Sequence, residues 1–323
     1  MNVYAKAGAC LLAGALLCTQ AFAERKYSDW GPAVNLGCGT INSASNDQGP
    51  GISKDGLSLY FGSDRAGGAG GLDLWVAQRP TQDAPWGTPA NLGPVVNSPG
   101  TDNVVSFSRD GHWMFFNSNR AGGFGDSDLW ASYRAHVHDD FAWETPVNLG
   151  GGINTAGFEG AASYFENEEG SAPLLFFGRG VSLATLGTTG DIWVAELLPD
   201  GTFGNARLVP ELSSPQGDQR PSIRFDGLEI FFFSNRPGST LDANNNPTTD
   251  IWVATRNSVN DPWDAPVNLG PAVNSAFPDI NVHISADALT LYFASSRPAG
   301  AGCGGNDLYM TTRHHLKGKD HQD

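Results

Sequence analysis

One segment recurs along the chain with small changes, and it limits the fold more than any other feature. The copies are WGPAVNLG, WGTPANLG, WETPVNLG, the degenerate FGNARLVP and WDAPVNLG, which begin at Trp30, Trp86, Trp143, Phe203 and Trp263. Their starts lie 56, 57, 60 and 60 residues apart. Each copy continues with an acid, a short apolar run, an aromatic run, a glycine-rich loop and the triplet D-[LI]-[WY]. Repeated units of this length with four short strands each are typical of a β-propeller.

The repeat predicts an all-β protein, a five-bladed β-propeller with four-stranded antiparallel blades over residues 24–313. We name the expected strands A to D from the channel outward, with the WxxPxNLG segment as strand D. The chain starts with a D strand at Trp30 and ends after a C strand at 307–313. The N-terminal strand must therefore complete the last blade, which closes the ring and leaves no free sheet edge.

Two cysteines bear on this closure. Cys38 directly follows the first D strand, and Cys303 lies four residues before the last C strand. Because neighbouring C and D strands run antiparallel, both residues fall at the same corner of the last blade. We therefore expect a Cys38–Cys303 disulfide, with two unpaired thiols as the alternative. In the chain-entropy model such a long loop contributes on the order of 5 kcal/mol.

The N-terminal segment predicts export. Lys6 precedes an apolar stretch, and Ala21-Phe22-Ala23 matches a signal-peptide cleavage site. We expect a signal peptide over residues 1–23 and a periplasmic or secreted protein, where a disulfide persists. No other run approaches the ~18 apolar residues of a transmembrane segment. Residues 314–323 are expected to form a disordered tail.

Composition excludes several functions. The formal net charge is −15, from 34 acidic and 19 basic residues, so nucleic acid is not an expected partner because phosphate binding needs a basic surface. The sequence holds no GxSxG, P-loop or CxxC motif. Eight of the nine tryptophans occupy repeated positions, which indicates packing between blades rather than sugar stacking. Trp113 alone lies outside that pattern.

The motifs DGLSLYFGSDRAGGAGGLDLW and DALTLYFASSRPAGAGCGGNDLY resemble the WD40-like repeat often called PD40. That repeat occurs in the TolB propeller and in exported proteins with OmpA-like tails. The resemblance covers about 290 residues and implies the fold, not an activity. The N-terminal domain of TolB and an OmpA-like tail are not expected here, so the partners of those proteins are not carried over. Five blades are also the scaffold of several glycoside hydrolase families, which is a likeness of fold alone.

Three rings of charged residues are expected on one face, formed by the D–A and B–C loops. An acid begins every A strand: Asp47, Asp102, Glu159, Asp218 and Asp279. An arginine follows every B strand: Arg65, Arg120, Arg179, Arg236 and Arg297. A second acid begins every C strand: Asp73, Asp128, Asp191, Asp250 and Asp307. A feature present in all five blades favours a structural role. We expect arginine–acid pairs that fix the loops and lower the pKa of the acids.

The alternative role for these acids is catalysis of glycoside hydrolysis, which requires two carboxyl groups at a set distance. The candidates are Asp47, Asp102 and Glu159, and Glu159 is the one non-aspartate of its ring.

Residues that break the fivefold pattern are the better guide to a ligand. Arg220 and Asn281 replace the small or apolar residues found two positions after the acid in the other units. With Asp218 and Asp279 they are the candidate ligand-binding residues, for a small anion or a sugar, and His283 lies nearby. A polar, water-filled channel is the alternative.

Cofactors are not expected, although a structural calcium ion is left open. Asp242, Asn244 and Asn246 have the alternating oxygen spacing of calcium loops, but the glycine of an EF-hand is missing. A solvated asparagine-rich turn is the alternative.

Taken together, the sequence favours an exported, monomeric binding module that recognises an envelope or extracellular protein, or a glycan. A carbohydrate-active hydrolase is the alternative, and the sequence does not decide whether the protein is an enzyme.

Overall fold

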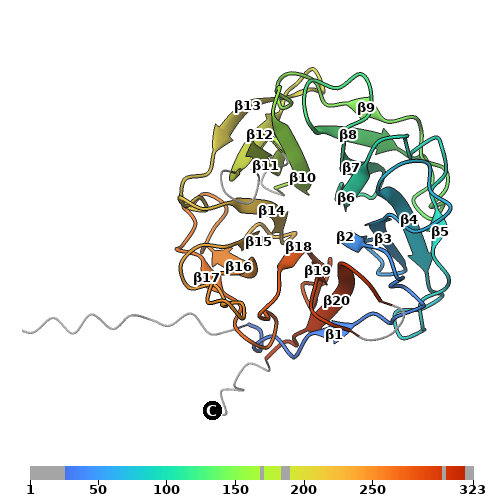
Figure 1. Ribbon diagram of the computed structural model, residues 1–323. Coiled ribbons are helices and arrows are strands. Elements are labelled where there is room, and N and C mark those ends of the chain that lie inside the picture. The colour runs from blue at the N-terminus through green and yellow to red at the C-terminus, as the bar shows by residue number, and fades with distance from the viewer. Residues whose placement is uncertain (1–25, 168–170, 183–189, 300–302, 317–323) are drawn as a thin grey trace, which may run out of the picture.

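The computed structural model describes residues 26–167, 171–182, 190–299 and 303–316. The expected signal peptide at 1–23 and the residues 317–323 of the expected tail lie outside these ranges. Within them, the chain forms five four-stranded antiparallel sheets arranged radially, so the predicted five-bladed β-propeller is confirmed (Figure 1). None of these residues belongs to a helix long and apolar enough to cross a membrane.

Each blade is formed by consecutive strands, except the last. Blade 1 contains β2 (Asp47–Ile52), β3 (Ser58–Ser63), β4 (Asp73–Gln78) and β5 (Ala90–Asn91). Blade 2 contains β6 (Asp102–Phe107), β7 (Trp113–Ser118), β8 (Asp128–Tyr133) and β9 (Val147–Asn148). Blade 3 contains β10 (Phe158–Phe165), β11 (Leu174–Gly180), β12 (Asp191–Leu197) and β13 (Phe203–Leu208). Blade 4 contains β14 (Asp218–Ile223), β15 (Glu229–Ser234), β16 (Asp250–Thr255) and β17 (Val267–Asn268). Blade 5 contains β18 (Asp279–Ile284), β19 (Thr290–Ser295), β20 (Asp307–Thr312) and β1 (Val34–Asn35).

Four of the five outermost strands have two residues each, because the NLG and INS motifs turn the chain; β13, in the unit without these motifs, has six. In blade 1, the side chain of Asn91 accepts a hydrogen bond from Gly93 N at 2.8 Å, and Gly93 has a φ of 81°, which favours glycine. Asn97 then bonds both backbone groups of Leu74, at 2.8 and 3.0 Å. Asn148–Asn154 and Asn268–Asn274 repeat this arrangement. The repeated asparagines therefore tie the outer segment to strand C in blades 1, 2, 4 and 5, whereas blade 3 lacks them.

The ring closes as predicted. β1 pairs antiparallel with β20, with Val34 opposite Met310 and Asn35 opposite Tyr309. The disulfide between Cys38 and Cys303 is present at the same corner, with a Cα–Cα distance of 4.8 Å. Pairing also continues past the expected end of the propeller, because Ser28 N donates to His314 O and Leu316 N donates to Lys26 O, both at 2.9 Å. Residues 314–316 are thus part of the closure.

The hydrophobic core lies between the blades. Five buried clusters each join side chains from two neighbouring blades. Trp143, for example, packs with Tyr60 of blade 1, with ring centres 6.3 Å apart. The expected packing role of the repeated tryptophans agrees with these clusters, whereas Trp113 is 39% exposed.

Candidate functional site

Each blade places one buried carboxylate at the start of its innermost strand. Every one of the five is paired with the arginine at or just after the end of the second strand, with nitrogen–oxygen distances of 2.5–2.9 Å. The pairs are Asp47–Arg65, Asp102–Arg120, Glu159–Arg179, Asp218–Arg236 and Asp279–Arg297. The predicted arginine–acid pairs are therefore confirmed, and we call each of them a clasp.

The clasp of blade 2 shows what these pairs do. Asp102 accepts from Arg120 at 2.5 Å through one oxygen, and from the backbone and hydroxyl of Ser98 at 2.6 and 2.9 Å through the other. Arg120 also donates to Val96 O at 2.6 Å, and its guanidinium carbon lies 5.1 Å from the centre of the Trp130 ring. The clasp thus joins two loops and the core, and it occupies both carboxylate oxygens.

The expectation that pairing lowers the pKa of these acids is wrong for two of them. Burial raises the pKa of Glu159 and of Asp279 above the ordinary value, although Arg179 and Arg297 act in the opposite direction. The cost of removing a charge from water exceeds the stabilisation by its arginine at these fully buried positions.

The acids of the second ring use other partners. Asp128 accepts from the backbone of Phe124 and Gly125 and from the side chain of Asn148. Asp307 differs, because one of its oxygens is buried and has no hydrogen-bond partner among the described residues. Burial, together with the nearby charge of Asp47, raises the pKa of Asp307 to about 6.

The candidate catalytic residues Asp47, Asp102 and Glu159 are therefore three clasp acids. All three are fully buried, and each uses both oxygens in hydrogen bonds. In this geometry they hold loops in place, and they do not present a pair of free carboxyl groups to a cleft.

The channel wall is built from a bulge that recurs in every blade. Each innermost strand shifts register against its neighbour two residues after the acid. The residues at the bulge have φ between 52° and 64°, and they are Gly49, Val104, Ala161, Arg220 and Asn281. A Cβ built on Gly49 would lie 2.8 Å from Val104 N, so the bulges of neighbouring blades adjoin. Four side chains are thus held in a left-handed conformation that only glycine adopts freely.

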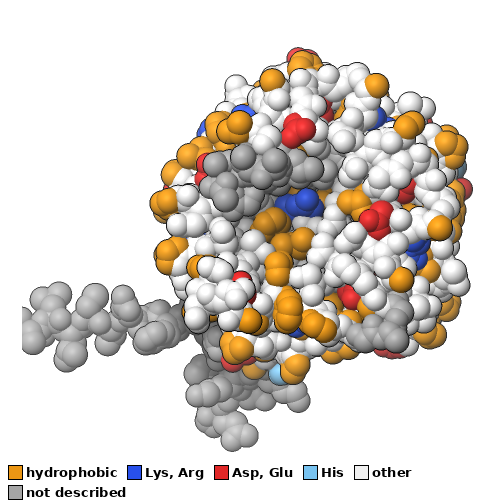
Figure 2. All heavy atoms as spheres, viewed as in Figure 1, with side chains coloured by type: hydrophobic (Ala, Val, Ile, Leu, Met, Phe, Trp, Pro, Cys, Tyr) orange, Lys and Arg blue, Asp and Glu red, His pale blue; other side chains and the backbone are white. Residues whose placement is uncertain are grey.

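Two of these bulge residues, Arg220 and Asn281, are polar and have buried side-chain atoms with no hydrogen-bond partner among the described residues. Arg220 forms no ion pair within the described part of the chain, and one of its terminal nitrogens is buried without a hydrogen bond. Burial lowers the pKa of Arg220 to about 10, so it stays charged at neutral pH. Both amide atoms of Asn281 and of Gln219 are likewise buried and have no hydrogen-bond partner in the described part of the chain. Figure 2 shows a hollow at the centre of the ring, lined by basic and apolar side chains.

The structure thus separates the four candidate ligand-binding residues into two kinds. Asp218 and Asp279 belong to clasps, whereas Arg220 and Asn281 lie on adjacent innermost strands, β14 and β18 (Figure 1). Gln219 was not among the candidates. The same position holds Gln48 in blade 1 and Asn103 in blade 2, so its residue type gave no signal.

His283 lies farther along β18, in a small cavity of about 40 Å³. Serines from three other innermost strands line the same cavity: Ser106, Ser163 and Ser222. Burial lowers the pKa of His283 to about 4, so its ring is neutral at physiological pH. It therefore adds no charge to the site of Arg220.

The candidate calcium loop is a turn that satisfies itself. Asp242 accepts hydrogen bonds from the backbone of Asn244 and Asn246, both at 2.8 Å. Within the described residues, no group of three or more His, Cys, Asp or Glu side chains is placed to hold a metal ion. The geometry agrees with the asparagine-rich turn.

No family model matches the sequence, and no curated protein matches it. Solved structures share the fold. An α-L-arabinofuranosidase from Lactobacillus brevis is 12% identical, covers 88% of this chain and 94% of its own, and has a TM-score of 0.54. A GH43 endo-arabinanase from Bacillus licheniformis is 14% identical, covers 87% and 97%, and has a TM-score of 0.55. A putative TolB from Agrobacterium tumefaciens is 12% identical, covers 84% and 91%, and reaches 0.44.

At these identities the likeness defines the class of the protein as a five-bladed propeller and carries no activity with it. The resemblance to PD40 repeats stays a prediction from the sequence.

Proposed function

We propose that this chain is an exported carbohydrate-binding propeller, periplasmic or secreted, that takes a carboxylated sugar at the mouth of its channel. The observation that carries the proposal is the unpartnered guanidinium of Arg220. Five other arginines in the same layer each have a carboxylate within the chain. Arg220 has no such carboxylate among the described residues, so its counter-ion is expected from a ligand.

The neighbouring groups fit a sugar acid. A guanidinium binds a carboxylate with two parallel hydrogen bonds. The free amide of Asn281, on the adjacent strand, offers donors and an acceptor, which suits hydroxyl groups. Buried polar atoms without partners cost about 1–3 kcal/mol each, so a ligand that satisfies them gains affinity.

The named functions of the solved structures support a carbohydrate ligand. Both proteins with a TM-score above 0.5 described above are enzymes named for arabinose-containing substrates. Arabino-oligosaccharides therefore belong in the test panel beside acidic sugars.

The test is isothermal titration of the mature chain with glucuronic-acid-containing oligosaccharides and with neutral arabino-oligosaccharides. Arg220→Gly keeps the left-handed backbone, as Gly49 does in blade 1, and removes the charge. We expect at least a ten-fold loss of affinity for the acidic ligand, because a charged hydrogen bond contributes about 1.5–3 kcal/mol. Arg207→Ala, at an exposed arginine, is the matched control. Equal affinity of wild type and Arg220→Gly would contradict the proposal.

Hydrolysis is the second candidate, and one observation favours it. Burial raises the pKa of Glu159, which is a property of a general acid. Its two oxygens are nevertheless engaged by Thr155 and Arg179. Release of reducing sugar from the same panel by the wild type, abolished in Glu159→Gln but not in Asp102→Asn, would establish an enzyme in place of a binding module.

A further inference from the structure

Four of the five grooves between blades contain a built-in arginine. The arginine at the end of strand C stacks on the tryptophan that opens the next segment, with the guanidinium carbon 4.2–4.5 Å from the ring centre. The pairs are Arg79–Trp86, Arg134–Trp143, Arg256–Trp263 and Arg313–Trp30. Each Nε also donates to a carbonyl of the turn between strands A and B, at 2.7–3.1 Å. The groove is thus shaped around a guanidinium.

The groove between blades 2 and 3 lacks this arginine. Leu197 occupies the equivalent position, because its backbone N–H donates to Pro173 O at 2.8 Å, as Arg79 donates to Leu57 O at 2.9 Å. Phe203 replaces the tryptophan. Blade 3 therefore has an apolar pair where the other blades have a cation on an indole.

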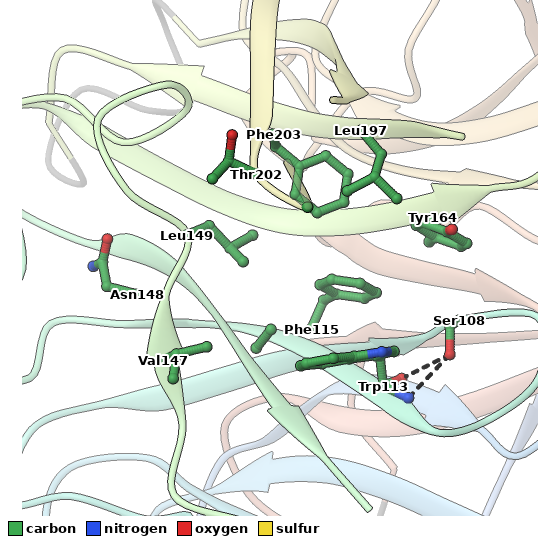
Figure 3. A pocket seen from close by; sticks show the side chains of 12 residues that line it. Ser108, Trp113, Phe115, Val147, Asn148, Leu149, Tyr164, Leu197, Thr202 and Phe203 are labelled. Atoms are coloured by element: carbon green, nitrogen blue, oxygen red, sulfur yellow. Dashed lines mark hydrogen bonds between the residues drawn. The ribbon is translucent and has the colours of Figure 1, made fainter. Parts of the chain in front are cut away.

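A pocket of about 380 Å³ opens at this groove. Figure 3 shows Trp113 and Phe115 on one side, Leu197 and Phe203 across from them, and Tyr164 at one end. No lysine or arginine is among the described residues that line it. Phe115 stacks on Tyr164 with ring centres 5.6 Å apart. The pocket is lined by four aromatic rings and is open to solvent beside the one tryptophan that lies outside the repeat pattern.

The equivalent groove between blades 4 and 5 shows what is missing. There Glu229 stands at the position of Trp113, and it pairs with Arg313 at 2.5 Å while Arg313 stacks on Trp30. That groove contains its cation, its anion and its aromatic ring within one chain. The groove between blades 2 and 3 has only the aromatic part.

The surroundings of the pocket favour a cation. Burial raises the pKa of Tyr164 to about 12, and the carboxylates of Glu166 and Asp110 contribute to this shift. Negative charge near an aromatic pocket disfavours an anionic occupant and attracts a positive one. The net charge of −15 acts in the same direction at longer range.

We propose that this pocket binds an arginine side chain of a partner protein, which places its guanidinium where the other four grooves hold their own. A cation over an aromatic face is stabilised by the ring quadrupole, and arginine is the residue most often found there. The site is separate from the channel, so it would serve a protein partner beside the carbohydrate.

The experiment uses ¹⁵N-labelled tryptophan in the mature chain and follows the indole N–H signal of Trp113, assigned with Trp113→Phe. The probes are acetyl-Gly-Arg-Gly-amide and the same peptide with citrulline, which keeps the shape and removes the charge. We expect a saturable shift with the arginine peptide and at least ten-fold weaker binding of the citrulline peptide. Leu197→Arg with Phe203→Trp rebuilds the internal pair and is expected to abolish the response.

A third peptide with leucine in place of arginine serves as an apolar control. The proposal would be overturned by equal binding of the arginine and citrulline peptides, by tighter binding of the leucine peptide, or by the absence of any shift. Unchanged arginine binding by the Leu197→Arg/Phe203→Trp variant would do so too. If that variant does not fold, Trp113→Ala replaces it, because Trp113 is partly exposed and its loss leaves the buried clusters intact. This variant lacks the reporting indole, so its binding of the two peptides is followed by isothermal titration calorimetry, and unchanged arginine binding would again overturn the proposal.

Discussion

Replacing Cys38 and Cys303 together by serine tests how the ring is held closed. The disulfide joins positions 265 residues apart, so it restricts nearly the whole unfolded chain. The chain-entropy model then gives about 5–6 kcal/mol at 25 °C, as an upper figure. An unfolding entropy of about 2.1 cal/mol/K per residue converts this into a fall in Tm of roughly 9 °C.

Scanning calorimetry of the oxidised wild type and the double serine variant measures this fall. Reductant should lower the Tm of the wild type to that of the variant and leave the variant unchanged. The bonds of β1 with β20 remain in both proteins, so the variant is expected to keep its fold. A decrease in Tm of less than 2 °C would refute the reasoning, because strand pairing and the interblade core would then close the ring without help from the disulfide.

Two further predictions concern buried polar groups. The first is His283→Ser, which copies Ser222 at the same position of blade 4. The pKa of His283 is about 4 in the folded protein against an ordinary 6.5, so the unfolded chain binds the proton first as the pH falls. The free energy of unfolding of the wild type therefore decreases between pH 6.5 and 4. We expect the variant to lose this part of the pH dependence, which amounts to at most about 3 kcal/mol of unfolding free energy measured by urea titration. If the unfolding free energy of the variant changed with pH as steeply as that of the wild type, the prediction would be wrong. Asp140→Ala leaves Arg134 buried beside Tyr60 without its carboxylate, which lay 2.7 Å away. A loss of about 3–5 kcal/mol is expected by denaturant unfolding, and a loss below 1 kcal/mol would show that the pair contributes little.

The fold was predictable because its signals are redundant. The WxxPxNLG segment, the triplet D-[LI]-[WY] and the order of the strands each recur, so one poor copy such as FGNARLVP does not change the conclusion. The position of Cys38 and Cys303 followed from the strand order alone. The arginine–acid clasps were predictable for the same reason, since complementary charges recur at fixed places in all five units.

The candidate site was harder to predict because it depends on what is absent around a side chain. The sequence shows that Arg220 breaks the pattern, but its missing counter-ion is a property of the folded ring. The bulge that holds Val104 in a left-handed conformation has no signature in residue type, since valine disfavours that region. The raised pKa of Glu159 likewise depends on burial, which outweighs the visible charge of Arg179.

The strand exchange at blade 5 has a consequence for how the protein is made. β1 is the first of the described strands to be synthesised, and its partner β20 is the last, with Asn35 and the facing Tyr309 separated by 309 − 35 = 274 residues. At 5–20 residues per second this delay is roughly 15–50 s. Blades 1 to 4 consist of contiguous chain and can form in the order of synthesis, while β1 waits unpaired. An incomplete chain would leave the faces of blades 1 and 4 uncovered. The ring is therefore sealed only after β20 has been made and has paired with β1.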